Sequence, residues 1–204
     1  MRQRGMKQLW LAAMSIAIVG IGLGLATVPA CSDESSSTNG SVTTIPSPAD
    51  AVSEELMLAL HNAKNLHHIA DVHVADGKLD LAAAAVQRVL AVTFPADAEE
   101  GESVRLDARA RLAKLLVLQS KHADAMKILD EGISRSKRES FFLANVYTVK
   151  GEVFKAMAKD ARDPSKGNDE ARAKELNRDA IKAYTRAISI DEALQKKLMK
   201  RRQR

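Results

Sequence analysis

The chain has 204 residues, and its 31 lysines and arginines against 26 aspartates and glutamates give a formal net charge of +5 at pH 7. Aromatic residues make up 3% of the chain, and there are only ten glycines and five prolines. This composition argues against a β-sandwich, a β-barrel or a collagen-like fibre and favours helices. A single cysteine excludes an internal disulfide framework and a thiolate zinc cluster.

The first thirty residues are typical of a secretory signal. Arg2, Arg4 and Lys7 form a positively charged start, and residues 9–28 carry no charge. An apolar stretch of this kind enters the bilayer while the cations stay on the cytoplasmic side. An uncleaved membrane anchor is the alternative, because about 20 apolar residues also suffice to span a bilayer. On either interpretation we expect the rest of the chain to lie outside the cytoplasm, tethered to a membrane.

The run Val28-Pro29-Ala30-Cys31 closes this stretch and resembles a bacterial lipobox. The last two residues match the lipobox pattern, and the first two depart from its usual residues. The resemblance implies that residues 1–30 are a lipoprotein signal peptide and that Cys31 is lipidated as the first residue of the mature chain. The serine that follows the cysteine favours the bacterial outer membrane, with the protein facing the periplasm.

Residues 31–48 are rich in serine and threonine and nearly lack large apolar side chains. Such a segment buries too little surface to offset its ordering entropy, so we predict a flexible tether. A helix is predicted to start at residues 47–50, where a hydroxyl, a proline and a carboxylate occur in the order that a helix start favours. Gly77 is predicted to end this helix, because glycine readily adopts the left-handed terminal conformation.

Apolar residues three or four positions apart predict further helices along the rest of the chain. The predicted ranges are 79–90, 106–119, 123–133, 141–158 and 176–190, with an amphipathic segment at 192–200. Two insertions are expected, at 97–105 and between 159 and 176, where Pro164 and Gly167 exclude a straight helix. No segment shows the alternation of a strand.

Three stretches, 66–90, 112–133 and 147–188, repeat small and apolar residues at corresponding positions and resemble tetratricopeptide repeats. Residues 179–191 are the closest match to that family's second helix. The resemblance implies an all-α fold, a right-handed α-solenoid of about three helical hairpins over residues 49–191, with 192–204 as a basic capping helix and tail. The repeats are spaced more widely than the family's period of about 34 residues. An irregular helical bundle with one repeat-like hairpin is the alternative.

In the tetratricopeptide family the first helix of each hairpin lines a shared concave groove. Carried onto this chain, the pattern gives mixed charges with a few apolar positions, which suits a protein or peptide partner better than an apolar small molecule. For each residue, ordinary solvated surface is the alternative. The predicted groove residues are Lys64, His67, Asp71, Asp107, Ala110, Lys114, Leu118, Asn145, Thr148, Glu152 and Lys155.

Four histidines, His61, His67, His68 and His73, crowd one predicted helix and raise the possibility of a metal site. No two of them are four residues apart, which is the spacing of helical zinc motifs. The preferred interpretation is therefore solvated or hydrogen-bonded histidines and no metal. The chain also lacks a glycine-rich phosphate loop and a nucleophile elbow, so we predict no enzyme and no cofactor.

The last nine residues carry six cations, among them Lys196, Lys197, Lys200, Arg201 and Arg202 in the predicted capping helix and tail. They are either a solvated helix end or a contact with anionic lipid. The rest of the mature chain is mildly acidic, so a nucleic-acid partner is not expected.

Together these features predict a lipoprotein that mediates protein interaction or assembly of an envelope complex. The alternatives are an envelope metal-binding protein or enzyme that uses residues 61–73, and a self-associating structural lipoprotein.

Overall fold

The computed structural model describes residues 48–96 and 98–203, and the side chains among them from residue 54 onward. The predicted signal peptide, Cys31 and the tether lie outside these residues. Within the described ranges the chain is all-helical and contains no strand. None of the helices described is long and apolar enough to cross a membrane.

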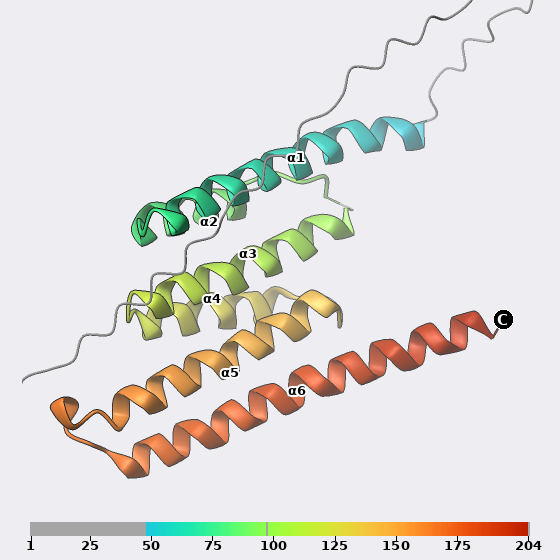
Figure 1. Ribbon diagram of the computed structural model, residues 1–204. Helices are drawn as coiled ribbons and strands as arrows, with labels where there is room; N and C mark the ends of the chain where they lie inside the picture. The colour runs from blue at the N-terminus through green and yellow to red at the C-terminus, as the bar shows by residue number, and fades with distance from the viewer. Residues whose placement is uncertain (1–47, 97, 204) are drawn as a thin grey trace, which may run out of the picture. The chain divides into compact units, whose positions relative to one another are not determined.

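Six α-helices follow one another, with one short 3-10 turn, Pro164–Lys166, between the last two. Odd-numbered helices run in one direction and even-numbered helices run back (Figure 1). All six predicted helices are present. Their bounds are α1 Pro48–Ala75, α2 Leu79–Leu90, α3 Glu99–Leu118, α4 His122–Arg135, α5 Phe141–Ala161 and α6 Glu170–Arg202.

Three predicted boundaries are wrong. The last helix was expected to start at residue 176, but α6 begins at Glu170. Residues 97–105 were expected to form an inserted loop, but α3 begins at Glu99, and its acidic first turn suits the positive end of the helix dipole. A separate capping helix was expected from residue 192, but α6 continues without a break to Arg202. Neither glycine nor proline occurs between residues 170 and 203 to end it. The far end of α6 extends past the start of α5 (Figure 1).

Each helix packs against the next one along the chain, and α3 also packs against α5. The core at these contacts combines fully buried alanines, such as Ala70, Ala82 and Ala113, with larger side chains such as Leu112 and Leu129. Small residues at a helix crossing let the two axes approach closely, and the larger ones fill the space beside it. Each fully buried leucine contributes about 2 kcal/mol by leaving water.

The α1–α2 and α3–α4 connections are built in the same way. In the first, Gly77 has φ 72° and the N–H of Lys78 donates to the His73 carbonyl at 2.8 Å. In the second, Ser120 has φ 60° and the N–H of Lys121 donates to the Leu116 carbonyl at 2.8 Å. Both are Schellman-type helix ends. The chain therefore makes two hairpins with equivalent turns.

The last hairpin, α5–α6, has a longer connection, as Pro164 and Gly167 predict. Asp163 caps the 3-10 turn, Gly167 has φ 102°, and the Asp169 carboxylate accepts from the Arg172 N–H at 2.8 Å to start α6. The two helices then approach closely at Gly151. A Cβ atom at that position would lie 2.6 Å from a ring carbon of Tyr184, so the glycine makes room for the tyrosine ring.

Candidate functional site

The structure joins four of the predicted groove residues in two pairs across the odd-numbered helices, His67 with Asp107 and Lys114 with Glu152, and a fifth, Asp71, pairs with Arg111. We call the polar surface that these three helices share the odd-helix surface. His67 and Asp71 come from α1, Asp107 and Lys114 from α3, and Glu152 from α5. These residues are up to 85 positions apart in the chain, so the packing of the helices, not local sequence, places them together.

His67 is the centre of the contacts between α1 and α3. Its Nδ1 lies 3.2 Å from Nη1 of Arg111, and its Nε2 lies 3.9 Å from the Asp107 carboxylate. The other terminal nitrogen of Arg111 pairs with Asp71. A guanidinium only donates hydrogen bonds, so Nδ1 must accept, and a neutral His67 carries its proton on Nε2, toward Asp107.

The pKa of His67 is lowered from its ordinary value. Burial is the main cause, because it disfavours the charged imidazolium, and the adjacent positive charge of Arg111 adds to the effect. Asp107 and Asp71 oppose this shift without reversing it. At neutral pH the cluster therefore holds an uncharged histidine between a guanidinium and two carboxylates.

A second contact joins α3 to α5. Nζ of Lys114 lies 3.6 Å from the Glu152 carboxylate, and both side chains are about half exposed. An exposed ion pair of this kind contributes less than about 1 kcal/mol to stability. The pair matters because it orients both side chains, so that the ammonium and the carboxylate stay on the surface that α3 and α5 share.

The other predicted groove residues are placed less uniformly. Lys64, Leu118 and Lys155 are exposed, with Leu118 at 64%, and Asn145 is partly buried. The hydroxyl of Thr148 donates to the Ala144 carbonyl at 3.2 Å within its own helix. Ala110 is only 1% exposed, so its methyl group belongs to the core and offers nothing to a partner. This corrects its assignment to the groove.

Arg111 is the residue of this surface that the sequence interpretation missed. It follows Asp107 by four positions and precedes Lys114 by three, so all three side chains share one face of α3. That spacing is a signal the sequence contains. The partner of Arg111, however, is Asp71 on α1, and only the folded structure reveals this side-chain contact between α1 and α3.

The histidines of α1 do not converge. His61 and His68 are exposed, His67 is engaged by Arg111, and His73 is half-buried, with a buried Nδ1 that has no hydrogen-bond partner among the residues described. In the described ranges no three histidine, cysteine or acidic side chains come together where they could hold a metal. The metal-site alternative therefore gains no support from this helix.

The predicted lipid-contacting cations occupy the exposed last turns of α6. Lys196, Lys197, Lys200, Arg201 and Arg202 are all exposed, and none forms an ion pair with another residue that the structure describes. Two apolar neighbours, Leu198 and Met199, are 58% and 66% exposed. This end of α6 thus presents cations together with apolar side chains.

No protein-family model matches the chain, and no curated protein or solved structure matches it either.

Proposed function

We propose that this protein is a lipid-anchored helical-repeat protein of a bacterial envelope, and that it binds a protein or peptide partner through the odd-helix surface. The observation that carries the proposal is the line of polar contacts across α1, α3 and α5, from Asp71 through Arg111, His67 and Asp107, and then from Lys114 to Glu152. Three helices separated in sequence contribute charged side chains of both signs to these contacts.

The packing pattern supports a repeat arrangement. Each hairpin contacts the next through neighbouring helices, and α3 also meets α5, which is the contact expected between the first helices of stacked hairpins. The equivalent turns at Gly77 and Ser120 add a second sign of repetition. We therefore propose that the three hairpins form a right-handed solenoid whose odd-numbered helices line its binding face.

The chemistry of the odd-helix surface favours a polypeptide ligand. Both signs of charge are present, and ion pairs hold these side chains in fixed directions. The side chains therefore lose less conformational entropy when a partner binds. Leu118 adds an exposed apolar position on the same helix as Lys114. An extended peptide or a loop with alternating charge and one apolar side chain would complement this arrangement.

Site-specific photocrosslinking in the producing bacterium tests the binding surface. A photoreactive residue at Leu118 or Lys155 should give a discrete crosslinked product of higher mass, whereas one at Lys127, an exposed position on α4, should not. A product containing only a second copy of this chain would replace the proposal by self-association. Equal crosslinking from all three positions would contradict it.

The proposed anchor has a separate test. Metabolic labelling with palmitate should mark the wild-type chain and not Cys31→Ala. Equal labelling would contradict lipidation at Cys31.

The exposed cations at the end of α6 are proposed to add contact with an anionic bilayer, at about 1 kcal/mol per charge near the surface. Replacing the five cations from Lys196 to Arg202 by glutamine should then weaken sedimentation of residues 49–204 with anionic vesicles but not with neutral ones.

A further inference from the structure

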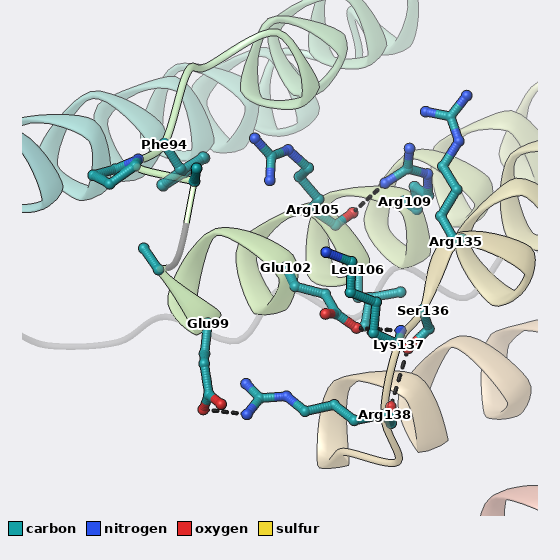
Figure 2. Close-up of a pocket in the computed structure, with 14 residues that line it drawn as sticks. Phe94, Glu99, Glu102, Arg105, Leu106, Arg109, Arg135, Ser136, Lys137 and Arg138 are labelled. Atoms are coloured by element: carbon teal, nitrogen blue, oxygen red, sulfur yellow. Dashed lines mark hydrogen bonds and ion pairs between the residues drawn. The ribbon is translucent and has the colours of Figure 1, made fainter.

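A cavity of about 630 Å³ lies between the α2–α3 connection, α3 and the end of α4 with its following loop. We call it the arginine pocket. Figure 2 shows Arg105, Arg109 and Arg135 along one part of its wall, and Glu99, Glu102 and Arg138 along another. Its volume falls in the range that small-molecule sites occupy. It uses a different face of α3 from the odd-helix surface, since Arg105 and Arg109 are out of phase with Asp107 and Arg111.

The charges that line the arginine pocket are mostly positive: Arg105, Arg109, Arg135, Lys137 and Arg138, against Glu99 and Glu102. Both acids are already engaged. Glu99 pairs with Arg138, and Glu102 accepts from the Ser136 hydroxyl at 2.9 Å and from the Lys137 N–H at 3.2 Å.

The three remaining arginines have no acidic partner. Among the residues the structure describes, Arg105, Arg109 and Arg135 form no ion pair. The guanidinium of Arg105 lies over the Phe94 ring, 5.0 Å from its centroid, which fixes its direction without neutralising it. A concentration of uncompensated guanidinium groups in one cavity attracts an anion.

Arg109 is the least expected of these side chains. It is only 7% exposed, and among the residues described it is the one charged side chain that is buried. One nitrogen donates weakly to the Arg105 carbonyl at 3.4 Å, and its buried Nε has no partner. Burial is the main cause that lowers the pKa of Arg109; the charges of Arg135 and Arg105 add to it, and Glu131 opposes it. Buried guanidinium groups are normally paired, and among the residues described no acid forms an ion pair with this one, so a ligand anion would complete its contacts.

Two glycines inside helices shape the walls of the pocket. A Cβ at Gly132 on α4 would lie 2.9 Å from Cδ of Arg109, and a Cβ at Gly101 on α3 would lie 2.7 Å from Cβ of Phe94. Glycine weakens a helix interior. Here the absence of a side chain lets Arg109 and Phe94 take the positions that form the cavity.

We propose that the arginine pocket binds a small organic anion through its phosphate or carboxylate group. Guanidinium groups suit this task because their planar forks donate two parallel hydrogen bonds to a pair of oxygens. Arg105, Arg109 and Arg135 bind the anionic group, and the apolar residues Phe94, Pro95 and Ala98 contact the rest of the ligand.

Titration calorimetry of the full-length chain in a non-ionic detergent tests this proposal, with inorganic phosphate and succinate as separate probes. At least one of the two should bind at a single site, and the one that binds tells which group the pocket prefers. Arg105→Gln and Arg135→Gln should each raise the Kd about tenfold or more, because each removes a charge-assisted contact. Arg178→Gln, on an exposed part of α6, is the matched control and should leave the Kd unchanged.

Arg109→Met provides a second measurement, because methionine keeps much of the volume and removes the charge. If Arg109 serves a ligand, this variant should lose binding while its thermal midpoint without ligand stays the same or rises. A lowered midpoint with unchanged anion binding would assign Arg109 to the core and overturn its role. Binding of neither probe, or an equal loss of affinity in Arg178→Gln, would overturn the proposal as a whole.

Discussion

Individual polar side chains decide how the two surfaces of α3 differ. On one face Arg111 satisfies its donors with His67 and Asp71, and on another Arg109 is buried without a counter-charge. Helical periodicity predicted that these residues belong to a helix. It could not tell which arginine finds an acid, because the partner depends on which helix lies opposite. Ala110 shows the same limit, since a pattern taken from a repeat family assigned a core methyl group to the surface.

The state of His67 makes a prediction about pH. Because its pKa is lowered in the folded chain, the neutral form is bound more favourably than the charged form, and protonation favours the unfolded chain. The contribution of His67 to stability is therefore complete above its ordinary pKa of about 6.5 and is lost as the pH falls through the lowered value.

We expect the free energy of unfolding to decrease between pH 7 and pH 5 in the wild type, and to decrease less in His67→Gln. Urea denaturation followed by circular dichroism at each pH measures both slopes. His61→Gln, an exposed histidine on the same helix, should keep the wild-type slope. A His67→Gln profile as steep as the wild type would show that the pKa of this ring is not lowered in the folded chain.

At the scale of helices and turns, the sequence was informative where stop signals are strong. Gly77, Pro164 and Gly167 mark connections that the structure contains. The sequence misled where such signals are absent or mixed. An insertion was expected at residues 97–105 because the repeats are spaced widely, but α3 begins at Glu99 and its Gly101 accommodates Phe94. The α3–α4 turn uses Ser120 in a conformation that usually signals glycine, at the position that the alignment of the repeats places opposite Gly77.

The two equivalent turns allow a reciprocal test. Ser120 has positive φ, which strains a residue with a Cβ, so Ser120→Gly should raise the free energy of unfolding by about 0.5–1 kcal/mol. Gly77→Ser should lower it by a similar amount or more, because Gly77 holds the corresponding position. Chemical denaturation measures both.

Ser189→Gly is the control for these substitutions, since Ser189 lies within α6, where glycine should destabilise by about 0.5 kcal/mol. If Ser120→Gly destabilised the chain as Ser189→Gly does, the two turns would not share one conformation.

At the scale of the whole chain, helices pack chiefly on their neighbours in sequence. Such contacts predict that stability is distributed unevenly, since a helix at one end can open without disturbing the other end. The presence of the six helices followed from periodicity alone. The sequence predicted the contacts between helices less completely. The contact between α3 and α5 skips a helix, and no local pattern encodes it.

Hydrogen exchange measured by mass spectrometry tests this distribution. Leu66→Ala removes a buried side chain from α1, at a cost of about 2–5 kcal/mol, and should lower protection mainly in α1 and α2. Leu129→Ala is the matched variant in α4, which packs against both α3 and α5, and should lower protection in all of these helices. If Leu66→Ala exposed α5 and α6 to the same degree, the helices would unfold as one cooperative unit.

The tyrosine that fills the space above Gly151 has an optical consequence. The chain contains one tryptophan, at position 10, and two tyrosines, Tyr147 on α5 and Tyr184 on α6. Near-ultraviolet absorbance and emission from the described helices therefore originate only in the last hairpin, where the Arg186 guanidinium also lies 5.9 Å from the Tyr147 ring centroid. Far-ultraviolet dichroism instead averages over every helix. A chain that lacks its first thirty residues thus carries a built-in local reporter, and heating curves from the two signals will separate wherever the first hairpins melt before the last.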